Sequence, residues 1–577
     1  MACVVYHVAI EDLRYVLESR DADVRDLQLH DVMILPTTIG RFTNLQSLVL
    51  HFCVLNALPP ELADLPLKTL CVDTCVGRYQ LPDALQFSTT LRVLAVRGSD
   101  LRDWLPRIAS LREVRVRNIC INYRFIEEDA LPKRESIMER CKELRVLSWD
   151  YGVPEFVACL PHLTSLTTWN VREGQTRRIP PTVVRLVVHS SEVGLLVDHL
   201  HKLEELEVHS CGGLGLLHKI PPSVQMLQVM KCRVALFGER FPLSRIPAVR
   251  SLKVSDGYVD GPLRGDTWRS ITLENCIASA DILTFDGQTH LETLVVRMNV
   301  RGLIIPPTMQ RLESLDLLCT CITTLPESLV ALPALRVLRV TGDGLRQLSA
   351  DFKHLDTLAI RNCGTIQVLP CTFASRLHHL DLSFTKVQLP PWELSQMETL
   401  ALPNLLTSVP PGVLSLQHLT TLSSLGCTEL TALPDGPVQL PALENLLLQH
   451  CVSLTCLPAW VGALPMLVKL DVTECVELQT LPVELGNAAR LRKLWVSRTA
   501  LTALPASLGR LTSLEKLDLS ECQGVPEVPD ELGGLEIFPV ALWRLVRPRF
   551  HAKQALLLLI LKGGLSAELW CVVHQFL

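Results

Sequence analysis

Three cysteines stand 24 residues apart, at Cys427, Cys451 and Cys475. Thiols at a fixed spacing could form disulfides, hold a zinc ion, or fill one position of a structural repeat. The chain has 20 cysteines in 577 residues, which is a low density for a disulfide scaffold, and it contains no CxxC pair. Paired zinc knuckles are therefore not expected, and the repeat is the first alternative to examine.

The sequence around these cysteines repeats one pattern. One copy reads L-x-x-L-x-L-x-x-C-x-x-L-x-x-L-P from Leu443 to Pro458, and the next runs from Leu467 to Pro482. Apolar residues that open such a copy recur about 23 times along the chain, at intervals of 19 to 25 residues with a single longer exception. The pattern resembles the leucine-rich repeat, whose period is about 20–29 residues.

The pattern also predicts how each copy folds. In L-x-x-L-x-L the apolar residues alternate with others, as a strand with one buried face requires. A single copy cannot bury that face, whereas stacked copies form a parallel sheet over a continuous core. The predicted fold class is α/β: a leucine-rich-repeat solenoid, curved as a horseshoe. We expect a parallel β-sheet on its concave face, short helices, turns and extended segments on its convex face, and a helical C-terminal cap.

The ninth position of each copy explains the regular thiols. It lies where the chain turns inward after the strand, and its side chain can donate a hydrogen bond to a buried carbonyl there. The ten cysteines at this position are therefore predicted to be structural: Cys53, Cys75, Cys211, Cys232, Cys276, Cys363, Cys427, Cys451, Cys475 and Cys522. Leu-Pro pairs then begin a short helical turn, and Gly462 and Gly486 are expected to end two of these turns.

The later repeats carry the most specific resemblance. The stretch LPASLGRLTSLEKLDLSEC is similar to the repeat regions of plant disease-resistance proteins and of Ras-pathway scaffold leucine-rich-repeat proteins. That resemblance implies a non-catalytic protein–protein interaction scaffold or recognition module in signalling, with partners bound on the concave face. The chain has no GxxxxGK[ST] nucleotide loop and no kinase or hydrolase signature, so no enzyme activity, cofactor or metal is expected.

The two ends depart from the repeat. We predict an N-terminal cap over residues 1–23, a solenoid over 24–535, and a helical segment over 536–577. The final LSAELWCVVHQFL resembles the opening helix of an F-box, a module that recruits ubiquitin ligases through an adaptor. The alternative function is thus a substrate receptor of a ubiquitin ligase. Removal of residues 536–577 separates the two hypotheses, because only the second predicts the loss of a ligase adaptor.

Candidate binding residues come from positions of the last repeats that should face solvent on the sheet. Trp495 is the unusual one, because a tryptophan among charges suits an interface anchor, although it could instead pack over its neighbours. Lysines precede these strand positions and charged residues follow them. The predicted protein-binding residues are Asp471, Glu474, Lys493, Trp495, Arg498, Asp518 and Glu521.

Charge and targeting signals bound the remaining possibilities. The net charge is −5, so no general nucleic-acid footprint is expected. The N-terminus lacks a basic region, and the run from Ala555 to Leu561 is too short to span a bilayer. We expect a monomer without a transmembrane segment, cytoplasmic with the nucleus possible, that binds other proteins. His189 and His209 share one column in adjacent repeats, without an evident third metal ligand.

Overall fold

The computed structural model describes the strands, turns and helices of most repeats. The described residues are 4–6, 24–30, 35–55, 57–72, 75–77, 82, 84–85, 88–97, 111–117, 143–149, 152–172, 174–191, 197–211, 220–232, 249–259, 263, 267–278, 281–285, 287–318, 321–348, 352, 354–366, 369, 376–387, 395–436, 438–522 and 536–538. The chain divides into an N-terminal unit, Met1–Asn299 with Ile304–Met309, and a C-terminal unit, Val300–Leu303 with Gln310–Leu577.

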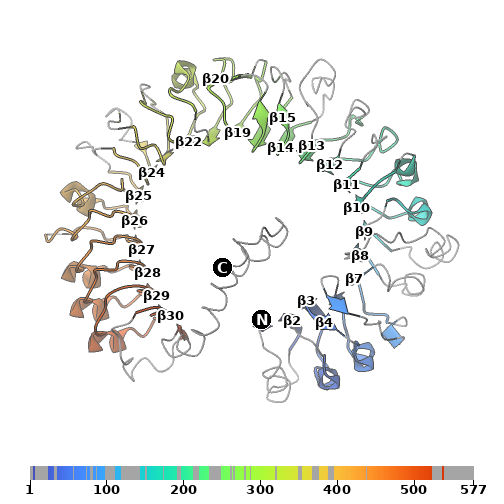
Figure 1. Cartoon of the computed structure of the whole chain (residues 1–577), viewed down its shortest axis with the longest axis horizontal. Helices are drawn as coiled ribbons and strands as arrows, with labels where there is room; N and C mark the ends of the chain where they lie inside the picture. Colours follow the sequence, from blue (N-terminus) through green and yellow to red (C-terminus); the bar gives the residue numbers. More distant parts are fainter. Residues whose placement is uncertain are drawn as a thin grey trace, which may run out of the picture. The chain divides into compact units, whose positions relative to one another are not determined.

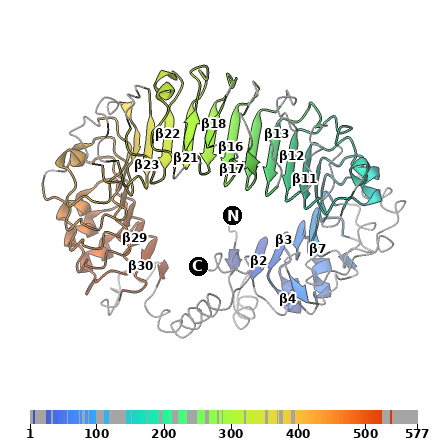
Figure 2. The ribbon, with the colours of Figure 1, turned by 45° about the horizontal axis from the view of Figure 1, so that its top comes forward.

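The N-terminal unit is a parallel sheet of consecutive strands. Its strands are β1 (Val4–Tyr6), β2 (Asp26–His30), β3 (Ser47–His51), β5 (Thr69–Cys71), β7 (Val93–Arg97), β8 (Glu113–Arg117), β9 (Val146–Trp149), β10 (Ser165–Trp169), β11 (Arg185–His189), β12 (Glu205–His209), β13 (Met226–Met230), β14 (Ser251–Ser255), β16 (Ser270–Glu274) and β19 (Thr293–Arg297). Each pairs with the strand of the next repeat without a shift of register. Figure 2 shows β11, β12 and β13 side by side in this unit.

The C-terminal unit has the same construction. Its parallel strands are β21 (Ser314–Leu318), β22 (Val337–Thr341), β23 (Thr357–Arg361), β24 (His379–Asp381), β25 (Thr399–Ala401), β26 (Thr421–Ser423), β27 (Asn445–Leu447), β28 (Lys469–Asp471), β29 (Lys493–Trp495), β30 (Lys516–Asp518) and β31 (Glu536–Phe538). The strands of this unit line its inner side in Figure 1, and the helical turns lie on its outer side.

Short 3-10 helices and strand pairs complete the coils. The helices are η1 (Thr37–Arg41), η2 (Pro60–Asp64), η6 (Glu155–Cys159), η7 (Gln175–Arg178), η10 (Glu327–Ala331), η12 (Pro411–Ser415), η13 (Ala459–Ala463), η14 (Val483–Asn487) and η15 (Ala506–Arg510). The short strands are β4 (Val54–Leu55), β6 (Val76–Gly77), β15 (Tyr258–Val259), β17 (Ile277–Ala278), β18 (Ile282–Thr284) and β20 (Gly302–Ile304). A proline caps η13, η14 and η15 at the N-terminus, as the Leu-Pro pairs predict.

The solenoid with a parallel sheet is therefore confirmed, and its core is the predicted apolar set. The central leucines Leu446, Leu470 and Leu494 are fully buried and lie in register on adjacent strands. Because each leucine row continues from one coil to the next, every repeat covers the apolar face of its neighbour.

The ninth-position cysteines also lie as predicted. All ten are free and buried, and the thiol of Cys451 donates to the carbonyl oxygen of Ser424 in the preceding repeat at 3.0 Å. Cys475 donates in the same way to Leu448 O at 3.1 Å. Burial raises the pKa of the Cys363 thiol to about 11, which keeps this sulfur a neutral donor. The thiols form a hydrogen-bonded ladder through the inner turns of the coils.

The ends differ in part from the expectation. β31 pairs in parallel with β30, so Glu536–Phe538 is a strand where a helical segment is predicted to begin. The reason is that the open edge of β30 has unpaired backbone groups that another strand can satisfy. In the predicted N-terminal cap, β1 pairs with β2. Residues 539–577, and with them the helical cap and the F-box-like helix, lie outside the described residues.

The glycines of the helical turns have a different role from the predicted one. Gly462 lies within η13 rather than after it, and its φ is not positive. A Cβ atom on Gly462 would lie 2.0 Å from the carbonyl oxygen of Glu484 in η14. Gly486 makes the same kind of approach, at 2.2 Å from Ser507 O. These glycines therefore permit close packing of consecutive helical turns, because any side chain would collide with backbone.

Gly462→Ala is expected to destabilise the C-terminal unit by several kcal/mol, since the neighbouring backbone must shift to admit a methyl group. Gly412→Ala is the matched control in η12, where a Cβ atom would meet nothing within 4 Å. It should be neutral or slightly stabilising. Urea unfolding midpoints of the two variants test the packing role, and equal midpoints would contradict it.

A second pair of variants tests the thiol ladder. Cys451→Ser retains a hydrogen-bond donor and should cost about 1 kcal/mol. Leu470→Asp places an unpaired charge in the core and should separate neighbouring repeats, at a cost above about 4 kcal/mol. The measurement is the loss of far-ultraviolet circular dichroism with urea. Similar losses for both variants would be inconsistent with the ladder.

Candidate functional site

The predicted binding residues come from three consecutive strands and from the turns that follow them. β28, β29 and β30 read K-L-D, K-L-W and K-L-D. Their register places the three lysines in one row and Asp471, Trp495 and Asp518 in the next. Because the middle leucine of each strand is buried, the residues before and after it share the face of the sheet that points away from the core.

The alternation of the strand predicts that Asp471 faces solvent, but its side chain is buried. Its side chain is only 1% accessible. Gln449 Nε2 donates to Asp471 Oδ2 at 2.7 Å, the Lys469 ammonium lies 3.4 Å from the same oxygen, and the Thr473 backbone N–H donates to Oδ1 at 3.2 Å. The carboxylate is thus enclosed by its own strand and by the preceding repeat, and its role is structural.

Two other aspartates at the third strand position, Asp518 and Asp381, also accept a hydrogen bond from the backbone N–H two residues later. Asp518 Oδ1 accepts a hydrogen bond from the Ser520 N–H at 2.9 Å. Asp381 Oδ1 accepts one from the Ser383 N–H at 3.0 Å in an earlier repeat. An aspartate here satisfies the amide two residues later, where the strand ends and the turn begins.

Trp495 is partly buried and has a fixed neighbour. The Lys469 ammonium lies 3.9 Å from the centroid of the indole, within the range of a cation–π interaction. Lys469 thus contacts both Asp471 and Trp495, and it holds the indole at one position on the sheet. Lys469 is not among the predicted binding residues, although the register of β28 and β29 makes it a diagonal neighbour of Trp495.

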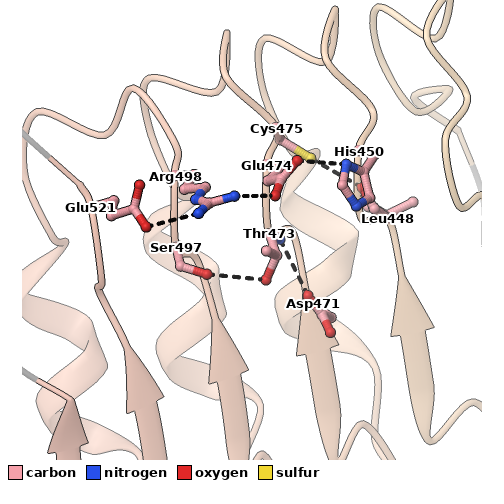
Figure 3. A network of polar contacts seen from close by, with 9 residues as sticks. All are labelled: Leu448, His450, Asp471, Thr473, Glu474, Cys475, Ser497, Arg498 and Glu521. Carbon is pink, nitrogen blue, oxygen red and sulfur yellow. Dashed lines mark hydrogen bonds and ion pairs between the residues drawn. The ribbon is translucent and has the colours of Figure 1, made fainter. Parts of the chain in front are cut away.

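Glu474, Arg498 and Glu521 form a separate row along the turns, shown in Figure 3. Arg498 donates to Glu474 Oε1 at 2.7 Å and to Glu521 Oε1 at 3.0 Å. His450 Nδ1 continues the row at 2.6 Å from Glu474 Oε2. Hydrogen bonds to Glu521 and Glu474 raise the pKa of Arg498. The polar side chains of this row therefore contact one another across four repeats.

The same four residues carry backbone strain. Their φ angles are positive, between 56° and 62°, in the left-handed region that residues other than glycine and asparagine disfavour by roughly 1 kcal/mol each. The ion pairs offset part of that cost. We therefore assign Glu474, Arg498 and Glu521 a part in holding the turns, beside the sheet face rather than on it.

Lys493 is a charged residue of this sheet face that has no counter-charge among the residues that the structure describes. Within the part of the chain that the structure describes, no carboxylate lies within 4.0 Å of its ammonium. It is partly buried, and it faces Lys469 and Lys516 in register on the two adjoining strands. Like charges at directly opposite positions are unfavourable. Lys493 and Trp495 are thus the two predicted residues of β29, and both are partly exposed on this face.

The N-terminal unit has a row of stacked rings at the ends of three strands. The Trp169 and His189 centroids lie 4.4 Å apart with an angle of 9°, and those of His189 and His209 lie 4.2 Å apart with an angle of 30°. Burial and the neighbouring His209 lower the pKa of His189 to about 4. Burial lowers the pKa of His209 too, aided by Lys231 and opposed by Glu207. Stacking favours neutral rings.

This row corresponds to the histidine column that the sequence reveals. Trp169 was missed, although it occupies the same position one repeat earlier. Among the described residues, no three histidine, cysteine, aspartate or glutamate side chains gather as metal ligands would.

Comparisons with known proteins concern the fold. No protein-family model and no curated protein matches the chain. Among solved structures, a leucine-rich-repeat protein of Leptospira interrogans is 20% identical with a TM-score of 0.41, over 70% of this chain and 97% of that one. The receptor kinase HAESA of Arabidopsis, solved with the peptide hormone IDA and the co-receptor SERK1, is 16% identical with a TM-score of 0.35, over 87% and 86%.

A third structure, an internalin of Listeria monocytogenes, is 14% identical with a TM-score of 0.32, over 64% of this chain and 93% of that one. At this level of likeness, what those proteins bind is not carried over to this chain. Separately, none of the helices in the described part of the chain has the length and apolar character needed to cross a bilayer.

Acidification from pH 6.5 to pH 4 is expected to destabilise the N-terminal unit. The unfolded chain takes up a proton on His189 near pH 6.5, whereas the folded ring does so only near pH 4, so stability falls across that interval. His189→Phe removes this proton and keeps a ring in the stack.

The measurement is the urea midpoint at pH 7.5 and at pH 4.5. The wild type should lose more stability on acidification than His189→Phe, whereas His162→Phe, at an exposed histidine, should behave like the wild type. An equal loss in the wild type and His189→Phe would show that the stack does not disfavour the proton.

Proposed function

We propose that this leucine-rich-repeat chain is a non-catalytic protein-interaction scaffold, and that it binds a partner on the concave sheet face of β28, β29 and β30. The observation that carries the proposal is the pair formed by Trp495 and Lys493. One is a large aromatic side chain in contact with the Lys469 ammonium, and the other is a cation without a counter-charge among the described residues.

Both properties suit a binding site. Tryptophan is enriched among the residues that contribute most to protein interfaces. An indole whose position is fixed before binding loses little conformational freedom when a partner covers it. The strands on either side continue the same face, so an extended partner would contact several repeats in register.

The scaffold fits a reducing compartment. Every cysteine that the structure describes has a free thiol, and ten of these thiols donate to or lie among buried backbone groups of the ladder. We therefore propose a cytosolic or nuclear location, where thiols stay reduced. The ubiquitin-ligase alternative depends on residues 539–577, and the experiment below includes it.

Trp495→Ala is expected to abolish or strongly weaken partner capture, since it removes the aromatic contact and frees Lys469 to move. The measurement is affinity capture with quantitative mass spectrometry from cells that express tagged full-length protein. Val483→Ala is the matched control, because Val483 is 66% exposed on η14, which belongs to the same repeat as β28 but lies on its outer side. Partners retained equally by all three proteins would rule out this face.

A chain without residues 539–577 tests the alternative function in the same experiment. It keeps β31, so the edge of β30 stays paired. Loss of a ligase adaptor alone, with the other partners retained, would favour a substrate receptor. Unchanged capture of all partners would favour the scaffold.

A further inference from the structure

The three strands of the proposed binding face share a lysine at the first position but differ two residues later. β28 and β30 place an aspartate two residues after the lysine, and β29 places Trp495 there. In β28 this arrangement forms an ion pair, with the Lys469 ammonium 3.4 Å from Asp471 Oδ2. The tryptophan therefore occupies the position from which the chain would otherwise neutralise Lys493.

The neighbouring carboxylates do not replace the missing one. Asp471 is enclosed by Gln449, Lys469 and the Thr473 amide, and it is not accessible to Lys493 from solvent. Asp518 accepts the Ser520 amide, and it lies no closer to the Lys493 ammonium than the 4.0 Å limit of an ion pair. Lys493 is thus left between two other lysines, with an indole as the next residue on its own face.

We infer that the partner supplies a carboxylate to Lys493 and, next to it, an apolar side chain that covers Trp495. This inference rests on the proposed function, because it describes the chemistry of the partner at the same face. The carboxylate completes the lysine–aspartate pair that β28 makes for itself. Coverage of the indole excludes water from that pair, which strengthens the attraction between the two charges.

An acidic side chain fits this position better than a phosphate does. Phosphate groups are usually bound by the paired donors of arginine or by several donors at once. Here the Lys469 ammonium is already paired with Asp471, and the guanidinium of the turn row, Arg498, is already paired with Glu474 and Glu521. We therefore assign the partner an aspartate or glutamate beside a large apolar residue.

The probe is a random dodecapeptide library displayed on phage and selected on the full-length protein. Peptides are retained if they bind the wild type but not Trp495→Asp, a variant that restores K-L-D in β29 and gives Lys493 its own carboxylate. The selected peptides should carry an aspartate or glutamate next to an aromatic or aliphatic residue. Their affinities are then measured with synthetic peptides by fluorescence anisotropy.

Lys493→Met should weaken a selected peptide about tenfold, whereas Lys493→Arg should weaken it less than threefold. Replacing the acidic residue of the peptide by its amide should also cost about tenfold, with no further loss on Lys493→Met. Arg339→Met is the control, since Arg339 is an exposed cation on β22 of the same unit. It should change the affinity by less than twofold, and thermal unfolding shows that each variant is folded.

The outcomes separate the inference from the proposed function. If the selected peptides bind Lys493→Met as tightly as the wild type, or prefer a phosphorylated residue to an acidic one, the inference is wrong and the binding face stands. If the selection yields no peptide that distinguishes the wild type from Trp495→Asp, the binding face itself is wrong. If each change alone weakens binding about tenfold and the two together weaken it no further, the result supports both the inference and the proposed binding face.

Discussion

A single repeat of this chain can neither bury its own leucines nor supply hydrogen-bond donors to all of its inward carbonyl groups. The leucines of each coil face a neighbour rather than their own strand, and the inward carbonyl groups of the turn need donors from the following coil. The ladder of buried thiols provides part of those donors, as Cys451 does for Ser424 and Cys475 does for Leu448. Because the requirement recurs at every repeat, it fixes the strand register, and the register in turn places the side chains of the sheet face in rows.

That regularity makes exceptions informative. In β28 the Lys469 ammonium pairs with Asp471 two residues later, so this strand balances its own charge. In β29 Trp495 stands at the position of that aspartate, so Lys493 lacks a carboxylate on its own strand. The turn row gives the opposite case, since His450, Glu474, Arg498 and Glu521 adopt a disfavoured backbone conformation and then pair with each other. Charge alone therefore does not mark a binding residue in this fold.

The period of the sequence was sufficient to predict the strands, the buried leucines and the structural role of the cysteines, because all three follow from the need of each coil for the next one. It was not sufficient for Asp471, which alternation assigned to solvent. Its burial depends on how Gln449 and Lys469 orient, and those orientations are not a property of the period. The glycines of the helical turns were misassigned for a related reason, since the distance between consecutive turns is a matter of packing.

The thiol ladder has a consequence for how the solenoid can be observed. Most described cysteines are buried, each in the turn after the strand of its own repeat, whereas Cys321 and Cys456 are exposed. An alkylating reagent reaches a buried sulfur only while the coils around it are apart, so its rate of labelling measures how often that place opens. Since many repeats carry their own sulfur, peptide mapping after brief labelling would give a local opening frequency along the chain without any introduced probe.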